Sequence, residues 1–330
     1  MVRERRHQQA LKLSLPLPNP ATDHQFWGET QLLPLLPSPD IEKVSDLEKM
    51  AILGQGSGSA VYKVVHKKTT AIYALKVLLL DRDSGSIRNR AAREAGILKR
   101  VDSEYIIGCH AILDDGFSGT EAKSGENYLC FVMEYMERGS LQEVLRARQR
   151  LPETVISGIA RRVLKGLRYL HGMKIVHRDI KPSNLLVNDK GEVKIADFGV
   201  SRVAMGAGAV AGAGAFEARD SAMGTCAYMS PERFDPETWG GGDGAADEFA
   251  GDVWSLGVVV LECHVGHFPL IGAGQIPDWV TLMCAICFGE RLEMPETASP
   301  EFRSFVRRCL ERDWRKRGTV AELLGHSFCD

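Results

Sequence analysis

Apolar residues follow two different spacings along the chain, and the spacing changes near residue 138. Between residues 47 and 137 they come in short runs rich in β-branched and aromatic side chains, which are typical of strands. One helical pattern, 88–101, interrupts them, because residues 94, 97, 98 and 101 share one face of a helix. This half predicts a small lobe of strands with a single helix. The predicted strands lie at 61–65, 72–80, 107–113 and 128–133.

Beyond residue 138 the apolar spacing is helical. The segment 153–171 repeats apolar residues at helical intervals, and a similar face recurs at 302–310. Ser140 and Glu143 have the spacing of a capping box, which predicts the start of a helix. We therefore expect an α+β fold of two lobes, a β-rich N-lobe and a larger helical C-lobe. The lobes would span 47–137 and 138–328.

Residues 1–46 show neither the strand-like runs nor the helical spacing of apolar residues. Prolines punctuate their apolar residues, as in 15–20 and 33–39, and prevent a regular helix. We expect a disordered tail here. Two further segments, 204–215 and 240–247, consist mainly of small residues and bury too little surface to offset the entropy of ordering. We expect both segments to be mobile.

The candidate chemistry is concentrated in two motifs of the C-lobe. The segment 177–184 reads His-Arg-Asp-Ile-Lys-Pro-Ser-Asn, and Asp-Phe-Gly begins at Asp197, eighteen residues after Asp179. Together they supply an acceptor carboxylate on Asp179, an ammonium group on Lys181, and oxygen ligands for a metal on Asn184 and Asp197. Phosphoryl transfer from ATP needs this set, because its catalysis rests on positioning and on neutralising phosphate charge.

The N-lobe carries two further features. A glycine-rich loop at Gly54, Gly56 and Gly58 would let backbone N–H groups approach a polyphosphate. That loop alone is weak evidence, since a hairpin turn produces the same pattern. Lys76 lies inside an apolar strand and needs an anion, because an unpaired buried charge is costly. Glu94 on the predicted helix is the candidate partner; the alternative is an ordinary solvated glutamate.

Together these residues resemble the eukaryotic protein kinases. The resemblance implies that Lys76 holds the α- and β-phosphates of ATP and pairs with Glu94. It also implies that Asp179 accepts or orients the substrate hydroxyl, and that Lys181 contacts the γ-phosphate. The catalytic residues would thus be Lys76, Glu94, Asp179 and Lys181.

The same resemblance assigns the remaining binding residues. Asn184 and Asp197 would hold Mg²⁺. Adenine would bind at a hinge around Tyr135, with Met133 as gatekeeper. The residues around ATP would be Leu53, Gly54, Gly56, Gly58, Val61, Lys76, Glu134 and Met136.

Two structural contacts also follow from the resemblance. Glu232 closes an activation segment at 197–232 and would pair with Arg317. Asp252 would anchor the catalytic loop. No catalytic position of the family is substituted in this chain, which favours an active enzyme.

A narrower resemblance rests on the segment 224–234, Gly-Thr-Cys-Ala-Tyr-Met-Ser-Pro-Glu-Arg-Phe, and on Val-Ser-Arg at 200–202. Both are similar to plant MAP kinase kinases, and Lys181 marks the serine/threonine branch. Members of that family use ATP and Mg²⁺ to phosphorylate Thr and Tyr in the activation loop of a MAP kinase. They are activated by an upstream MAP kinase kinase kinase, so the resemblance implies one partner on each side.

The activation segment departs from that family. Plant members are switched on at two hydroxyls six residues apart; the second falls here on Ser221 and the first on Ala215. Residues 203–220 contain no Ser, Thr or Tyr, so no shifted alignment supplies the first site. Ser221 is therefore the single predicted phosphosite. Glu217 would either add a fixed negative charge nearby or lie in solvent without a role.

The N-terminal tail resembles the docking motif by which these kinases hold MAP kinases. Basic residues, including Arg5 and Arg6, precede Leu11 and Leu13. The basic cluster would face an acidic patch, and the alternating leucines would enter apolar pockets. Such patterns arise easily in tails, so this interpretation depends on the kinase motifs.

The composition of the chain limits the kinds of partner it could bind and the cellular compartment it could occupy. A net charge of −2 over 330 residues argues against a nucleic-acid binder, which would carry a basic excess. No apolar run reaches the ~18 residues of a membrane span, and no signal sequence is evident. The eight cysteines are scattered, which fits a reducing compartment, the cytoplasm with the nucleus as a second candidate. We interpret Cys284 and Cys287 as buried thiols on one helix face rather than as zinc ligands.

Two alternatives stay open. The first is another serine/threonine kinase of the same broad group, such as an upstream kinase of the cascade. The second is a weakly active scaffold that docks MAP kinases. Ala215 favours the scaffold, and so does Gly96, because a glycine two residues from Glu94 costs the helix about 1 kcal/mol relative to alanine.

Overall fold

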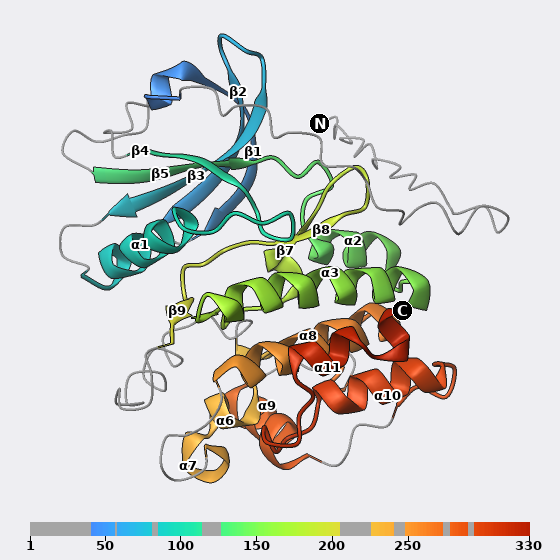
Figure 1. Ribbon diagram of the computed structural model, residues 1–330. Coiled ribbons are helices and arrows are strands. Elements are labelled where there is room, and N and C mark those ends of the chain that lie inside the picture. The colour runs from blue at the N-terminus through green and yellow to red at the C-terminus, as the bar shows by residue number, and fades with distance from the viewer. Residues whose placement is uncertain are drawn as a thin grey trace, which may run out of the picture. The chain divides into compact units, whose positions relative to one another are not determined.

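Residues 40–330 form one unit by their internal contacts, which contains a sheet lobe and a helical lobe (Figure 1). The computed structural model describes 41–56, 58–80, 85–113, 127–204, 226–240, 248–272, 278–289 and 294–330. The predicted docking motif, the phosphosite and both low-complexity segments lie largely or wholly outside these ranges.

The N-lobe is a five-stranded antiparallel sheet in the order β1-β2-β3-β5-β4. Each predicted run of apolar residues forms a strand, as expected. The strands are β1 (Leu47–Gly56), β2 (Ser59–His66), β3 (Ile72–Leu80), β4 (Cys109–Leu113) and β5 (Asn127–Glu134), after a 3₁₀ turn at Val44–Asp46.

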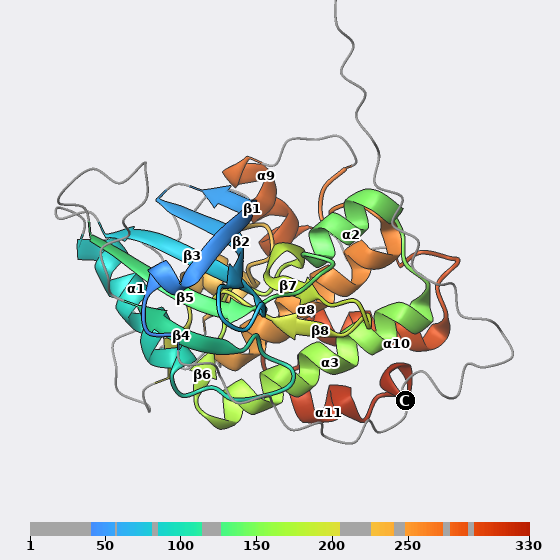
Figure 2. The same cartoon turned by 90° about the horizontal axis from the view of Figure 1, so that it is seen from above.

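The single helix of this lobe is α1 (Gly85–Leu98), which Figure 2 shows beside the strands when viewed from above. It ends three residues before the predicted position 101. The amide of Arg100 donates to the carbonyl of Ile97 rather than four residues back, so the last turn tightens and the chain leaves the helix.

The alternation of strand residues decides which side chains face the rest of the protein. Leu75 and Val77 of β3 are buried in a small core with Val64 and Val132 on one face of the sheet. Lys76 lies between them in sequence and therefore points to the opposite face. That face carries the inner residues of α1 and meets the main core of the protein.

The C-lobe is built on two long helices, α3 (Glu153–Gly172) and α8 (Glu248–Val265). The predicted face of α3, from Ile156 to Leu170, is buried. Most residues of α8 are buried, as expected for a helix that is apolar on all sides. The other helices are α2 (Leu141–Arg148), α6 (Pro231–Phe234), α7 (Pro236–Trp239), α9 (Trp279–Met283), α10 (Pro300–Cys309) and α11 (Val320–Leu324).

Short strands and turns connect the two long helices and carry the sequence motifs. The strands pair antiparallel as β6 with β9 and β7 with β8. They span β6 (Ile175–Val176), β7 (Leu185–Val187), β8 (Val193–Ile195) and β9 (Arg202–Val203), with the turn η2 (Pro182–Asn184) before β7. Two further turns, η4 (Cys284–Phe288) and η5 (Ser327–Cys329), lie after α8.

Local details of the C-lobe test two predictions. The capping box at α2 is confirmed, because the Glu143 amide donates to Ser140 Oγ (3.4 Å) and the Ser140 amide donates to Glu143 Oε2 (2.7 Å). The prediction for the cysteines is right for Cys287, which is buried, and wrong for Cys284, which is exposed. The helix widens there into the π-helical turn η4, which turns the two thiols onto different faces.

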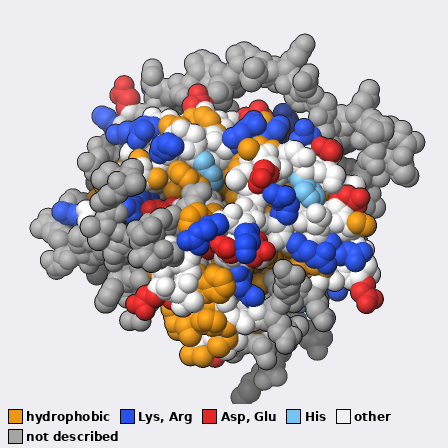
Figure 3. All heavy atoms as spheres, turned by 60° about the horizontal axis from the view of Figure 1, so that its bottom comes forward, with side chains coloured by type: hydrophobic (Ala, Val, Ile, Leu, Met, Phe, Trp, Pro, Cys, Tyr) orange, Lys and Arg blue, Asp and Glu red, His pale blue; other side chains and the backbone are white. Residues whose placement is uncertain are grey.

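The surface of the described part carries both signs of charge. On the face shown in Figure 3, Lys and Arg side chains are interspersed with Asp, Glu and apolar side chains. None of the described helices is both long enough and apolar enough to cross a membrane.

Candidate active site

Lys76 is the centre of an ion-pair cluster where α1, β3 and the Asp-Phe-Gly motif meet. Its Nζ lies 2.6 Å from Glu94 Oε1 and 2.9 Å from Asp197 Oδ1. The predicted pairing with Glu94 is therefore present, and the solvated alternative for Glu94 does not hold, since its side chain is only 3% exposed. Helix α1 runs through Gly96 without interruption.

The electrostatics of this cluster favour the charged forms of Lys76 and Asp197. Burial alone would lower the pKa of Lys76, but Asp197 and Glu94 outweigh burial and raise it. Burial alone would raise the pKa of Asp197, but Lys76 and the amide of Gly199 lower it to about 2. Burial raises the pKa of Glu94, and Lys76 offsets this only in part. One ammonium group thus faces two carboxylates, which leaves the cluster with negative charge to spare.

Asp179 lies at the centre of the catalytic loop. Its Oδ2 accepts hydrogen bonds from Lys181 Nζ (2.8 Å) and Asn184 Nδ2 (2.8 Å). Its Oδ1 is buried and has no hydrogen-bond partner among the described residues. An unpaired buried carboxylate oxygen is costly, so a hydrogen-bond donor brought to this atom would be stabilising.

A buried residue of α8 holds the backbone of this loop, as predicted. Asp252 accepts from the amides of His177 (2.9 Å) and Arg178 (2.8 Å) and contacts His171 Nε2 at 2.9 Å. Burial alone would raise the pKa of Asp252, but these contacts, led by His171, lower it. The amides of the loop are therefore tied to a charged acceptor inside the C-lobe core.

Two residues of the site have backbone conformations that favour glycine. Arg178 has φ 70° and Asp197 has φ 65°. Such conformations cost of order 1 kcal/mol or more and persist only where the surroundings impose them. At Arg178 the imposed contact is the bond to Asp252, and at Asp197 it is the ion pair with Lys76.

The predicted pair at the end of the activation segment is also present. Arg317 donates to both oxygens of Glu232, at 2.7 and 2.9 Å. Its remaining N–H groups donate to the carbonyls of Glu311, Ala250 and Arg312. The pair is fully buried, and every donor of the guanidinium group is used.

The predicted ATP-binding residues surround the same face of the sheet. In β2, Val61 pairs with Lys76, and the glycine loop joins β1 to β2 at Gly56–Ser59. Gly58 has φ +76°, which glycine tolerates best, and a Cβ on Gly54 would meet nothing within 4 Å. Met133, near the end of β5, and Met136, just after it, are both buried.

The structure adds contacts that sequence reasoning missed. Ser201 Oγ donates to the carbonyl of His177 (2.9 Å), which ties the segment after Asp197 to the catalytic loop. Lys194 Nζ donates to both oxygens of Glu134, so that carboxylate is engaged within the protein. A signal for Lys194 existed: it is a lysine inside an apolar strand, like Lys76.

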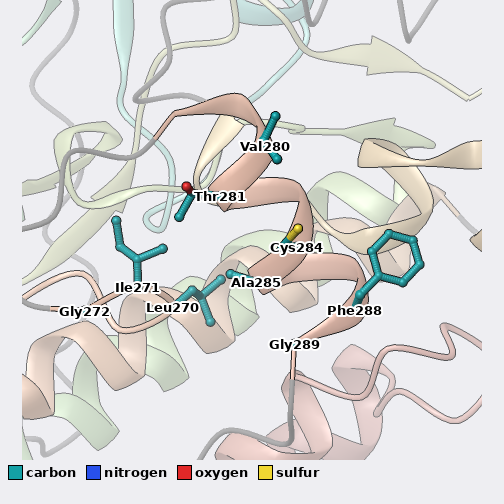
Figure 4. Close-up of a pocket in the computed structure, with 9 residues that line it drawn as sticks. All are labelled: Leu270, Ile271, Gly272, Val280, Thr281, Cys284, Ala285, Phe288 and Gly289. Carbon is teal, nitrogen blue, oxygen red and sulfur yellow. The ribbon is translucent and has the colours of Figure 1, made fainter.

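A cavity of about 540 Å³ lies elsewhere in the C-lobe, between 270–272, α9 and η4 (Figure 4). Val280 and Phe288 on its rim are 62% and 57% exposed. Among the described residues, no predicted site residue and no charged side chain lines it, so it does not compete with the Lys76 cluster as the site of chemistry.

Several predicted residues lie outside the described part of the chain. They are the phosphosite Ser221 with Ala215 and Glu217, and the docking residues Arg5, Arg6, Leu11 and Leu13.

The sheet lobe, the helical lobe and the cluster between them define a protein kinase. The family model of the protein kinase domain matches residues 47–329, nearly the whole described unit. A protein kinase domain implies the use of ATP and a divalent metal ion.

Comparison with curated proteins narrows the class. The chain is 51% identical to mitogen-activated protein kinase kinase 10 of Arabidopsis thaliana, over 99% of this chain and 98% of the relative. It is 47% identical to mitogen-activated protein kinase kinase 9 of the same plant, with the same coverage, and 37% identical to mitogen-activated protein kinase kinase 1c of Physcomitrium patens, over 88% and 79%. The chain belongs to the plant MAP kinase kinases, the middle tier of the MAP kinase cascade.

Proposed function

We propose that this protein transfers the γ-phosphoryl group of ATP to the Thr and Tyr hydroxyls in the activation loop of a MAP kinase. The observation that carries the proposal is Asp179. One of its oxygens is held by Lys181 and Asn184, and the other is buried without a partner among the residues described. A substrate hydroxyl is a donor of the kind that Oδ1 requires.

Asp179 would receive the proton of that hydroxyl on Oδ1 as the oxygen attacks phosphorus. Lys181, 2.8 Å from Oδ2, would hold the carboxylate in place and offset negative charge on the transferred group. The amides that Asp252 holds fix the loop, so Asp179 does not need to be reoriented during the reaction.

The residues present fit a divalent metal. Asn184 uses its amide N–H groups on Asp179, which leaves its Oδ1 as an acceptor, and Asp197 contributes a carboxylate that is 46% exposed. Oxygen ligands of this kind are what Mg²⁺ prefers. Asn184 and Asp197 would hold Mg²⁺, which when bound neutralises charge on the phosphates.

ATP would lie against the face of the sheet that carries Lys76. Lys76 would contact the α- and β-phosphates while Glu94 holds its side chain in place. The glycine loop at 54–58 would approach the phosphates with backbone N–H groups. At the hinge, backbone groups of Glu134 and Met136 would bind adenine, since the Glu134 carboxylate is already engaged.

Regulation would run through one phosphate. Ser221 is the proposed activation site, with Ala215 in place of a second hydroxyl. A phosphate brings about −1.5 to −2 charge and three acceptor oxygens, which suits pairing with an arginine such as Arg178. An upstream MAP kinase kinase kinase would supply it, and Ser221→Ala should abolish stimulation.

The tail would hold the substrate. Arg5, Arg6, Leu11 and Leu13 are the proposed docking residues, within a tail at 1–46 ahead of a kinase domain at 47–328. We place the protein in a reducing compartment, the cytoplasm with the nucleus as a second candidate, because none of the eight cysteines, all of them in the described ranges, forms a disulfide. Truncation of the tail should raise KM for a whole MAP kinase and leave KM for ATP unchanged.

The decisive test offers the protein a panel of kinase-inactive MAP kinases with Mg·ATP. Mass spectrometry should find phosphate on both Thr and Tyr of the activation loop of at least one. Asp179→Asn, which keeps the shape of the loop but removes the proton acceptor, should abolish the signal. Binding of a MAP kinase with equal phosphorylation by wild type and D179N would instead support the scaffold alternative.

A further inference from the structure

An ion pair joins the two lobes on the back of the hinge. Lys194 Nζ in β8 lies 2.7 and 2.8 Å from the two carboxylate oxygens of Glu134, the last residue of β5. Their side chains are 15% and 30% exposed. The pair is thus partly shielded from water, where a charge–charge contact is stronger than at the surface.

Glu134 is tied at the same time to the segment between α1 and β4. Its Oε2 accepts from the Gly108 amide (3.2 Å), and its own amide donates to the Gly108 carbonyl (2.9 Å). One residue thereby links the end of β5, the start of β4 and β8.

The segment that leads into Gly108 is fixed to the C-lobe. The Ile107 amide donates to the Ile195 carbonyl, and the Ile195 amide donates to the Tyr105 carbonyl, both at 2.9 Å. A Cβ on Gly166 of α3 would lie 3.3 Å from Tyr105, so helix and segment approach closely. The segment is therefore tied to β8 up to Ile107, immediately before Gly108 and the ion pair.

No second cation in the described surroundings replaces Lys194. Burial lowers the pKa of the neighbouring His110; Glu134 opposes this shift, and Lys194 adds to it. The Lys194 ammonium is thus the group in direct ionic contact with Glu134.

We propose that Glu134 and Lys194 are positioning residues that latch the lobes in the arrangement where Asp197 meets Lys76. β8 leads directly from Lys194 through Ile195 to Asp197, so whatever fixes Lys194 fixes the approach of Asp197. The latch is closed in the same structure in which Lys76 contacts both Glu94 and Asp197. Opening the latch would release β8 from β5 and loosen the site for nucleotide and metal.

The inference rests on the proposed function only for its kinetic readout, because nucleotide affinity tests it without a protein substrate. We would measure the affinity of the full chain for Mg·ADP by calorimetry, together with kcat and KM for ATP. Lys194→Met should weaken Mg·ADP binding and raise KM about threefold to tenfold, as loss of one partly buried ion pair implies. Lys194→Arg should restore both values to near those of the wild type.

Two further variants separate a latch from a general loss of stability. Lys316→Met makes the same change in an exposed pair with Asp313 and should leave affinity and KM unchanged. In a double-mutant cycle, Glu134→Gln combined with Lys194→Met should weaken Mg·ADP binding and raise KM for ATP no more than Lys194→Met alone.

The outcomes distinguish the latch from the function. Three results would overturn the latch and leave the proposed kinase activity intact. They are an unchanged Mg·ADP affinity in Lys194→Met, a rise in its kcat, or a double variant whose loss of affinity equals the product of the two single losses. A wild-type chain that does not bind Mg·ADP would overturn the proposed function itself.

Discussion

Two ion-pair clusters of this protein contain similar charged groups but differ in how completely the donors of the cation are hydrogen-bonded. In the C-lobe, Arg317 is buried with Glu232 and all five of its N–H donors are used by five acceptors. Between the lobes, Lys76 has three donors and contacts only two described acceptors, both of them carboxylates. The first cluster is complete, and the second has both a donor and negative charge to spare.

This difference distinguishes a cluster that stabilises the fold from one that can bind a ligand. A buried charged group that is fully hydrogen-bonded has nothing left to offer a ligand, so its role is to hold the fold. A cluster that is incomplete within the chain gains by binding a phosphate or a cation. The predictions below test that division, from the largest expected effect to the smallest.

Breaking the complete cluster should mainly cost stability. Arg317→Met leaves Glu232 charged and buried, which should lower the free energy of unfolding by roughly 3–5 kcal/mol in urea titrations. Arg308→Met is the matched control: its pair with Glu322 is about half exposed, and its loss should cost no more than about 1 kcal/mol. Equal costs for the two variants would contradict the assignment of Arg317 to the structural class.

Breaking the incomplete cluster should mainly cost activity. Lys76→Arg keeps the charge but replaces a compact ammonium with a planar guanidinium group that cannot fit between Glu94 and Asp197 in the same way. Initial rates of MAP kinase phosphorylation should fall at least about 10²-fold. The melting temperature should change little, and Lys316→Arg should change neither quantity. A Lys76→Arg enzyme with normal rates would remove Lys76 from the chemistry.

The helix that presents Glu94 has a weak point that can be repaired. A Cβ on Gly96 would meet nothing within 4 Å, so Gly96→Ala should stabilise α1 by about 1 kcal/mol in thermal unfolding. Basal kinase activity should rise with it. Gly257→Ala in α8 is the contrast, because its Cβ would lie 2.5 Å from that of Cys309 and should destabilise the protein. No gain from Gly96→Ala would show that this glycine is not a weak point.

The smallest effect is a pH dependence at Asp197. Its pKa is lowered from 3.8 to about 2, so the charged form stabilises the folded state above about pH 4, and this contribution is lost as the pH falls toward 2. Asp197→Asn should therefore cost about 0.5 kcal/mol of stability at pH 6, a value limited by solvent at a half-exposed side chain. The difference from wild type should vanish near pH 2. A difference that does not vary with pH would assign the stability to another contact.

Much of this site could be predicted from the sequence because the motifs fix their own geometry. Asp179, Lys181 and Asn184 lie within one short loop, so their proximity follows from the order of residues. The position of Lys76 inside an apolar strand predicted that its charge would need a partner. The spacing of Glu94 placed it on the same helix face as apolar residues that were expected to be buried.

The other contacts of the site could not be predicted, because they join residues whose proximity in space does not follow from their spacing in the sequence. Glu134 and Lys194 are sixty residues apart and meet only because β5 and β8 lie on the two sides of the hinge. Ser201 reaches His177 through a turn that no local pattern encodes. The exposed thiol of Cys284 follows from the π-helical turn, whose wider spacing breaks the α-helical rule used to predict it.

Asp252 has a consequence for how the enzyme completes one cycle and starts the next. Because its carboxylate holds two amides of the catalytic loop from inside α8, the loop belongs mechanically to the C-lobe and not to the hinge. Under the proposed mechanism, product would leave and fresh nucleotide would enter through movement of the sheet alone. Each round of turnover would then begin with its proton acceptor already in place, and reorganisation of the loop would add nothing to the cycle time.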